Sequence, residues 1–200
     1  MKRFCLCLVA VLVLSSCTPV DDFGVYWDKG FVDPALEGSW KKLRLPGEEN
    51  PNPTLGPDLL RFTRNGSSYS LQGINPIDQT AAPDVIEDQK ATNEARMSAR
   101  TLRIGKHLFL IQREPGGQGM GSIERYDVQR GTLQEYWIDN GAAVEFLKAK
   151  HPTAKNIKKN VGEGEFVVIN TFDDEVFQVL SEIADNPAYW FLNCRYKKVR

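Results

Sequence analysis

The sequence predicts a mainly β protein, an antiparallel meander of short strands followed by two late helices. Asn65-Gly66 separates two runs of alternating character, 59–64 and 68–72, and this dipeptide is the strongest short-range signal for a β-hairpin. Further strand-like runs recur at roughly ten-residue spacing, as in antiparallel sheets and barrels. Helical spacing of apolar residues begins only after residue 140. The chain is therefore assigned to the mainly β (α+β) class.

The individual strands follow from local alternation and turn residues. A first strand is expected from Trp40 to Leu45, where Leu43 and Leu45 share a face. Two more hairpins are expected, with strands 96–104 and 108–112 around Gly105-Lys106, and 122–129 and 133–138 around Arg130-Gly131. Residues 75–93 are polar and contain two prolines, so a long loop is expected there. Such a meander either closes as a barrel or stays an open sheet packed by helices, and the sequence leaves both open.

The last third of the chain mixes helices with strands. A helix is expected over 142–150, a buried strand over 165–171 and a final strand over 189–197. A second helix should run through Ala184, capped by Thr171 or Asp173, because acidic residues crowd its first turn. Its apolar stripe consists of Val176, Phe177, Leu180 and Ile183.

The N-terminus has the layout of a secretory signal peptide. Lys2 and Arg3 precede an apolar run over 4–14, which is shorter than the roughly 20 residues that a membrane-spanning helix needs. Leu14-Ser15-Ser16-Cys17 resembles the lipobox of bacterial lipoproteins. The resemblance implies a signal peptide over 1–16 and a Cys17 that is lipidated and becomes the mature N-terminus. A plain signal peptide with a chance cysteine is the alternative.

The same resemblance implies a location. Two or three acyl chains, at ~0.8 kcal/mol for each buried methylene, hold a protein durably on a membrane. In bacterial lipoproteins an Asp after the lipidated cysteine often marks inner-membrane retention, and this chain has Thr18 there. We therefore expect a membrane-anchored protein of the cell envelope, at the outer membrane and facing the periplasm.

The remainder is divided into a tether and one domain. Residues 17–35 are expected to form the lipidated N-terminus and a tether, because glycine, proline and aspartate interrupt any regular element. Tyr26, Trp27 and Phe31 should pack on the domain or lie at the membrane surface. Residues 36–200 are expected to form a single β-rich globular domain.

Gly38-Ser39-Trp40, followed by the hairpin meander and a late helix, resembles the lipocalins and the wider calycin group. The resemblance implies a barrel in which Trp40 plugs the closed end and Arg195, from the last strand, stacks on it. A barrel of about eight strands can hold one small apolar ligand. Tyr126, Tyr136 and Trp137 either line such a site or fill the core.

Composition narrows the chemistry. The precursor has a net charge of −1, with 25 basic and 26 acidic residues, which does not favour nucleic acid as a partner. No catalytic motif, cofactor motif or metal-ligand spacing is recognised, and His107 and His151 are interpreted as surface residues. Cys194 is left as a lone thiol, interpreted as a core residue. Lysines over 148–159 form a basic segment, interpreted as a solvated surface or a contact for anionic lipid.

These observations lead to one expectation and one alternative. The expectation is a non-catalytic, lipid-anchored envelope lipoprotein that binds a small apolar ligand in a barrel, without a cofactor or metal. The alternative is a structural or assembly lipoprotein that acts through contacts with another envelope protein. The identity of the ligand or partner, the physiological process, the oligomeric state and the role of Cys194 stay open at this point.

Overall fold

A computed structural model describes residues 18–43, 56–116, 121–161 and 165–199. Cys17 and the signal peptide over 1–16 lie outside these described residues. The strands are β1 (Thr18–Asp22), β2 (Gly38–Leu43), β3 (Leu59–Asn65), β4 (Ser68–Ile74), β5 (Met97–Ile104), β6 (His107–Arg113), β7 (Gly121–Gln129), β8 (Thr132–Ile138), β9 (Ile157–Val161), β10 (Glu165–Thr171) and β11 (Trp190–Val199). The helices are α2 (Tyr26–Lys29), α3 (Pro83–Glu94), α4 (Asn140–Lys150), α5 (Asp174–Ile183) and the short 3-10 turn Pro187–Tyr189.

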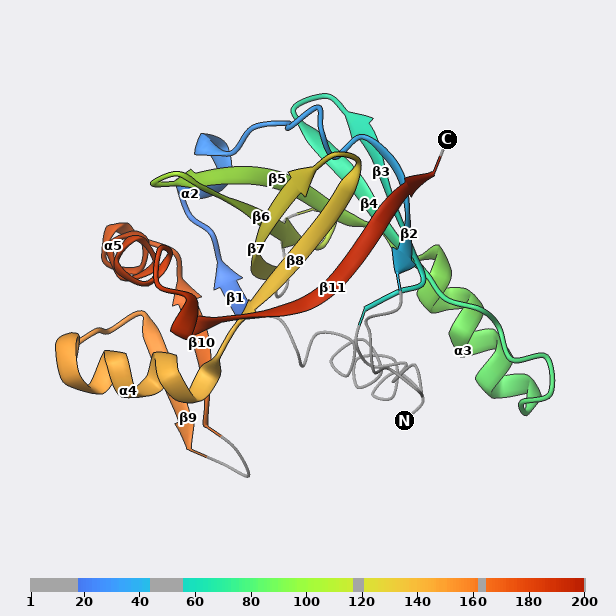
Figure 1. The fold of residues 1–200 in the computed structure, drawn as a ribbon. Coiled ribbons are helices and arrows are strands. Elements are labelled where there is room, and N and C mark those ends of the chain that lie inside the picture. Colours follow the sequence, from blue (N-terminus) through green and yellow to red (C-terminus); the bar gives the residue numbers. More distant parts are fainter. Residues whose placement is uncertain (1–17, 44–55, 117–120, 162–164, 200) are drawn as a thin grey trace.

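Eight of the strands close into an antiparallel barrel (Figure 1). Their order is β6-β5-β4-β3-β2-β11-β8-β7, and β7 pairs back with β6. The barrel confirms the expected fold class and decides between the closed and the open sheet. Closure removes the free edges that an open antiparallel sheet would expose.

The sheet forks at β7. One edge of β7 pairs with β8 over 125–129 and with β1 over 121–123. β1 then pairs in parallel with β10, which pairs with β9. A small three-stranded extension thus leaves the barrel at this fork, with α4 and α5 beside it (Figure 1).

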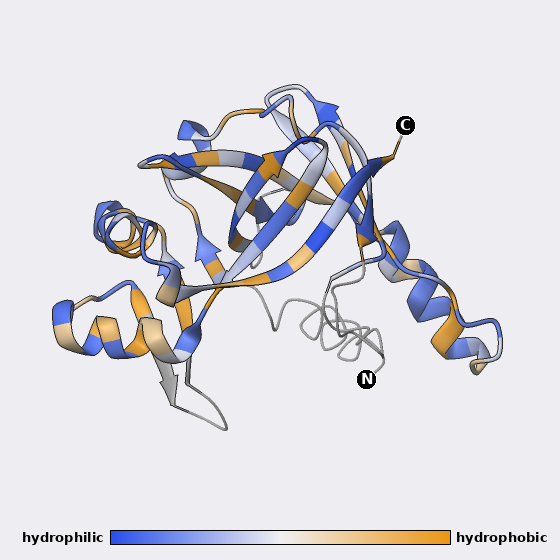
Figure 2. Ribbon diagram, viewed as in Figure 1, coloured by the Kyte–Doolittle hydropathy of each residue, from blue (hydrophilic) through white to orange (hydrophobic). Residues whose placement is uncertain are grey.

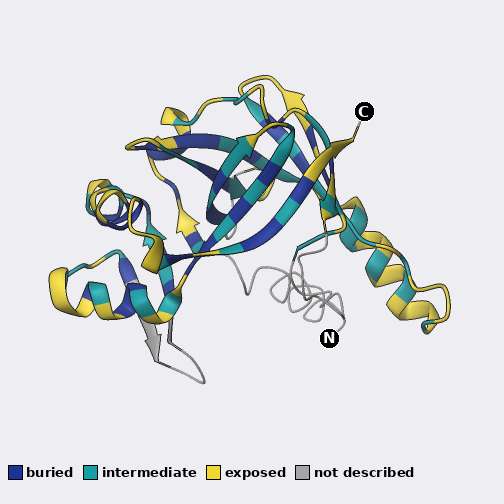
Figure 3. Cartoon of the chain, viewed as in Figure 1, coloured by how far each residue is buried: buried dark blue, intermediate teal, exposed yellow. Residues whose placement is uncertain are grey.

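Two apolar cores result. The barrel core lies in the interior, and its largest fully buried side chains are Trp40, Phe62, Tyr69, Leu133 and Tyr196. The second core lies outside the barrel wall and is built by β1, α2, α4, α5, β10 and the outward residues of β5, β6 and β7. Figure 3 shows the alternation of buried and half-buried residues along the barrel strands that this arrangement requires.

The expected hairpins are confirmed. β3 and β4 meet at Asn65-Gly66, where Gly66 has a φ of +60°, a conformation that glycine adopts without strain. The other two hairpins also form around their expected turns. α5 begins where expected, since the Asp173 side chain accepts a hydrogen bond of 3.0 Å from the backbone N–H of Val176.

The expected loop over 75–93 is wrong, because residues 83–94 form helix α3. Its first residue is Pro83, which suits a helix start, but none of its residues is buried and no apolar stripe marks it. Polar contacts hold it to the barrel instead. The amide of Asn93 donates to the carbonyl of Asn75 at 2.8 Å and accepts from the backbone N–H of the same residue at 2.8 Å.

The structure places residues 18–35 differently from the expected tether. Thr18–Asp22 is a strand of the sheet, and Val20 is fully buried. Tyr26 and Trp27 are buried in the second core, as one of the two expectations for them had it, whereas Phe31 is partly exposed and bridges to Thr101. The glycine, proline and aspartate residues of this segment predicted a tether, and the strand and the helix within it are too short to show a hydrophobic period.

Candidate functional site

One end of the barrel interior is closed by residues 33–36, in the segment between α2 and β2 that crosses the top of the view in Figure 1. The indole N–H of Trp40 donates to the carbonyl of Leu36 at 2.7 Å. The hydroxyls of Tyr69 and Tyr126 both donate to Asp33, to its carbonyl at 2.9 Å and to its carboxylate at 2.8 Å. Trp40 therefore lies at the closed end, as the resemblance implied.

The expected stacking of Arg195 on Trp40 is wrong. Arg195 lies opposite Leu43 and Gln134, which places it on the outer face of the barrel. Lys198 is the residue registered opposite Trp40, and its Nζ lies 5.1 Å from the centre of the Trp40 ring. Successive side chains of a strand point to opposite faces. Arg195 points outward, so the cation over the inward Trp40 ring comes from a residue of the opposite parity, and Lys198 is three positions further along β11.

The opposite half of the interior contains polar side chains on neighbouring strands, here named the polar cluster. Its members are Lys42, Gln112, Ser122, Glu124, Glu135, Cys194 and Tyr196. They follow from register, because Cys194 lies opposite Glu135 and Tyr196 lies opposite Lys42. Gln112 donates to a carboxylate oxygen of Glu124 at 3.0 Å.

Two buried carboxyl groups dominate the electrostatics of the polar cluster. Glu124 and Glu135 are each 6% exposed. Burial raises the pKa of Glu135 well above its usual range, the charge of Glu124 raises it further, and the ammonium of Lys42 works in the opposite direction. Burial thus favours the neutral form of the Glu135 carboxyl, a form that can donate a hydrogen bond.

The thiol and phenol of the cluster are also kept neutral. Burial raises the pKa of the Cys194 thiol to about 12, and the carboxyl of Glu135 adds to this. Burial also raises the pKa of Tyr196 well above its usual range. The thiolate is the nucleophilic form of cysteine, so Cys194 is a poor nucleophile here. Its expected position in the core is confirmed.

Hydrogen-bonding capacity is left over in the polar cluster. The buried hydroxyl of Ser122 has no hydrogen-bond partner among the described atoms, and that of Tyr196 has no oxygen or nitrogen partner. The Tyr196 hydroxyl lies beside the Cys194 thiol, which is only a weak hydrogen-bonding group. An unsatisfied buried polar group costs about 1–3 kcal/mol, so these two hydroxyls favour a polar ligand group or water nearby.

The mouth of the barrel, at the end of the polar cluster, is covered by Gly56 and Pro57. A methyl group added to Gly56 would lie 2.7 Å from the Tyr196 hydroxyl oxygen and 2.9 Å from the Cys194 sulfur. Only glycine allows the backbone to approach these atoms so closely. Pro57 packs on Gly73 of β4 in the same way. Among the described residues, the backbone at Gly56 thus covers the Tyr196 hydroxyl and the Cys194 thiol.

Two hollows in the described structure lie outside the barrel interior. One, of about 10 Å³, lies between α4, α5 and β10 and has room for no more than one water molecule. The other is an open surface groove of about 270 Å³ beside α3. Among the described residues, no group of three or more His, Cys, Asp and Glu side chains is arranged to hold a metal ion, and no helix is long and apolar enough to cross a membrane.

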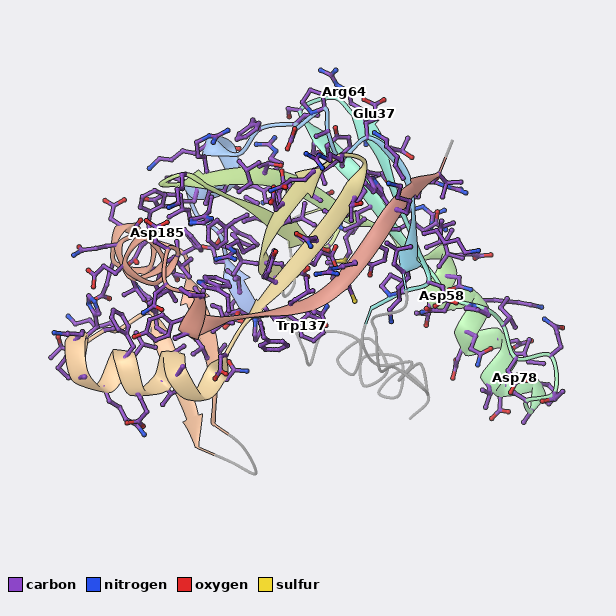
Figure 4. The ribbon with its side chains drawn as sticks, viewed as in Figure 1. Glu37, Asp58, Arg64, Asp78, Trp137 and Asp185 are labelled. Atoms are coloured by element: carbon purple, nitrogen blue, oxygen red, sulfur yellow. The ribbon has the colours of Figure 1, made fainter. Side chains whose placement is uncertain are left out.

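The three aromatic residues that the sequence predicted to line a site or fill the core have structural roles. Tyr126 braces the closed end, and Tyr136 lies on the outer face with the guanidinium of Arg125 4.5 Å from its ring centre. Trp137 is buried on the lower side of β11 in the view of Figure 4, and its indole N–H lacks a partner among described atoms.

Both histidines contact acidic residues at or near α5. His107 lies 2.6 Å from the carboxylate of Asp185, which Figure 4 labels beside α5, and His151 lies 3.0 Å from that of Glu182. In the basic segment 148–159, Lys148 pairs with Glu145 at 2.9 Å.

The polar cluster was missed at the level of sequence. The sequence contained an indication of it. Glu124 lies two positions from the buried Tyr126, and Glu135 lies two positions from the buried Leu133, so both acids point into the barrel. A charged residue at an inward position is a departure from the usual alternation and can mark a site.

Comparisons of the chain with protein-family models, with curated proteins and with solved structures return no match.

Proposed function

We propose that the chain is a lipid-anchored lipoprotein of the bacterial cell envelope, with Cys17 as the lipidated residue, whose barrel binds one small, largely apolar ligand without catalysis. The polar cluster is the observation that carries the binding proposal. The hydroxyls of Ser122 and Tyr196, which have no oxygen or nitrogen partner among the described atoms, lie in a half of the barrel that also holds the buried acid Glu135, whose pKa is raised.

The chemistry of the cluster specifies the ligand further. The ligand takes an apolar body, for the aromatic and aliphatic wall, and one uncharged polar group that accepts from Glu135 or a hydroxyl. The closed half of the barrel is filled by Trp40, Phe62 and Tyr69, so the ligand occupies the half that holds the polar cluster, beside Gly56.

The proposed location in the cell envelope rests on the N-terminal residues alone. The lipobox resemblance at Leu14-Ser15-Ser16-Cys17 supports the anchor, and Thr18 after the cysteine supports the outer membrane, facing the periplasm. The neutral state of Cys194 and the absence of a recognised catalytic motif in the sequence support a non-catalytic role.

Native mass spectrometry tests the binding proposal. The Cys17→Ser protein, exported with a signal peptide that is cleaved before residue 17, is purified and its mass compared before and after denaturation. We expect an excess mass that disappears on denaturation and is lost in a Glu135→Leu variant, which fills the site with an apolar side chain. A bare mass that persists after incubation with a panel of lipids overturns the proposal.

The filled closed half favours a second candidate, a structural or assembly lipoprotein that acts through protein–protein contacts. β9 lies at the end of the sheet, with no strand on its outer edge among the described residues. Such an edge can pair with a strand of another chain. A bare-mass monomer in the same experiment, together with crosslinks to another envelope protein in cells, would favour this candidate over ligand binding.

A further inference from the structure

The outer wall of the barrel formed by β2, β3 and β11 has an unusual charge. These strands contain seven lysine and arginine residues, two in β2, two in β3 and three in β11, and no aspartate or glutamate. The whole chain, by contrast, has a net charge of −1. In Figure 2 the C-terminal part of β11, which contains three of these cations, is predominantly hydrophilic.

Four of these cations point outward and form what we name the basic face. They are Lys41, Arg61, Arg195 and Lys197, which alternate with inward residues such as Trp40, Phe62 and Tyr196. None of the four takes part in an ion pair within the described chain, and the Lys197 ammonium donates only to the carbonyl of Arg130 at 3.3 Å.

The basic face is unfavourable for the fold by itself. Lys41 of β2 lies directly opposite Lys197 of β11. Like charges at such a cross-strand pair destabilise a sheet, so an anionic partner would relieve a repulsion that the fold leaves uncompensated. Leu43 and Val199, which share the outward direction of Arg195 and Lys197, are 38% and 47% exposed. Cations interleaved with exposed apolar side chains suit a lipid surface better than a soluble anion.

β1 begins directly after Cys17, the proposed lipidation site. Thr18, the first residue after Cys17, is only 5% exposed and is paired with Ile123 of β7. A trans peptide separates neighbouring Cα atoms by about 3.8 Å, so a lipid on Cys17 would have no spacer between it and the sheet.

The chain enters the domain two strands away from β2. β1 joins β7 where β8 leaves it, and β8 is the neighbour of β11, which is the neighbour of β2. Across the strands, at about 4.8 Å each, the entry point lies roughly 10 Å from β2. Along the strands, Ile123, which pairs with Thr18, lies six residues before Gln129, whose partner Thr132 lies opposite Lys197. At about 3.4 Å per residue this adds about 20 Å. A flat membrane surface can reach both the anchor and the basic face at this separation.

We propose that the basic face is a docking surface for the anionic head groups of the membrane that holds the anchor. The inference rests on the lipidation of Cys17 in the proposed function, but not on ligand binding in the barrel. It gives the domain one fixed orientation, with the outer wall of β2, β3 and β11 on the lipid and the two late helices displaced from it.

Lysine footprinting on vesicles tests the orientation with the lipidated, full-length mature protein. The protein is reconstituted into phosphatidylcholine vesicles with or without phosphatidylglycerol, treated with an amine-reactive reagent, and the modification of each lysine is measured by mass spectrometry. We expect Lys41 and Lys197 to react more slowly on the anionic vesicles. Lys106, on the turn between β5 and β6, should react equally on both. The protection should disappear in about 1 M salt, where the screening length falls to about 3 Å.

Two double variants that remove the same charge from different places measure how strongly the basic face contributes to docking. Each lysine near an anionic surface strengthens attraction about fivefold, so Lys41→Gln/Lys197→Gln should lower the ratio of docked to undocked protein about 25-fold. The Lys90→Gln/Lys106→Gln variant removes the same charge elsewhere and should leave docking nearly unchanged. Protection of Arg61 by anionic vesicles, measured with an arginine-selective reagent, provides a readout that survives if a lysine variant folds poorly.

The outcomes separate the two proposals. An N-terminal peptide without the mass of a lipid overturns the anchor and the docking together. Equal labelling of Lys41 on both vesicle types, in protein whose lipid mass is verified, overturns the docking surface alone. Protection by soluble polyphosphate but not by anionic vesicles assigns the face to an anionic polymer and overturns the membrane assignment. None of these results depends on whether the barrel carries a ligand.

Discussion

The closed end of the barrel depends on one hydroxyl group, which Tyr126→Phe removes. That hydroxyl lies 2.8 Å from the Thr101 hydroxyl and donates to the Asp33 carboxylate at 2.8 Å. A tyrosine has a single hydroxyl proton, so its bond to Asp33 leaves Thr101 as the donor of the other bond. The arrangement ties Asp33, in the segment that closes this end of the barrel, to β5 and β7.

The size of the effect follows from what the variant leaves behind. Thr101 is fully buried, so its hydroxyl would lose its partner without gaining water. A buried unsatisfied hydroxyl costs about 1–3 kcal/mol, and a hydrogen bond to a charged group contributes about 1.5–3 kcal/mol. Because the two contributions overlap in one rearranging site, we expect Tyr126→Phe to lower the free energy of unfolding by about 2–4 kcal/mol.

Urea unfolding of the Cys17→Ser protein measures this loss, read from the midpoint at an unchanged slope. Tyr136→Phe is the matched control, since its hydroxyl donates at 3.0 Å to Gln134, two residues away on the outer face. The control should lose about 0.5 kcal/mol or less. A Tyr126→Phe loss no larger than that of the control would refute the bracing of the closed end, as would additive losses in a double-mutant cycle with Thr101→Val.

Three further predictions concern titratable groups. The folded-state pKa of Glu135 is raised, so its contribution to stability is full below about pH 4.5 and is lost as pH rises. Glu135→Gln should therefore flatten the dependence of the free energy of unfolding on pH between about pH 5 and 8. If urea unfolding shows the same pH dependence in the variant as in the parent protein, the buried acid is contradicted. Cys194, with a pKa of about 12, should resist iodoacetamide at pH 8 in the folded protein and react after denaturation; equal rates measured by mass would show an open thiol. The pKa of Glu182 is lowered, chiefly by its hydrogen bond to His151, so this contact stabilises the fold at pH values above the ordinary carboxyl pKa and is lost on acidification. In thermal melts, Glu182→Gln should be less stable than the parent protein at about pH 6 and equally stable at about pH 3. An equal deficit at both pH values would point to packing instead.

Patterns of local alternation determined much of the fold. Asn65-Gly66 and Arg130-Gly131 fixed two hairpins because turn geometry is set by a few adjacent residues. Asp173 fixed the start of α5 through a hydrogen bond within one turn. The amphipathic stripe of that helix also placed Val176, Leu180 and Ile183 in a core. These signals need no knowledge of distant parts of the chain.

Elements without a local period could not be predicted in this way. α3 has no buried side chain, and polar contacts made by Asn93 with Asn75 hold it in place. β1 is five residues long and is stabilised by β7 and β10, which lie about 100 and 150 positions later in the chain. A strand of this length is defined by its partners, because half of its hydrogen bonds would otherwise go to water.

The sequence by itself determined the class of the fold, the hairpins, the helix that Asp173 caps and the resemblance of Cys17 to a lipidated cysteine. The tertiary structure decided that the sheet closes, and that Lys198 instead of Arg195 covers Trp40. It also brought Glu124 and Glu135 into one half of the barrel and gathered the cations of β2, β3 and β11 on one outer wall. The physical reason is register. Alternation tells which residues share a face of a strand, but only the pairing of strands far apart in sequence decides which residues of different strands meet.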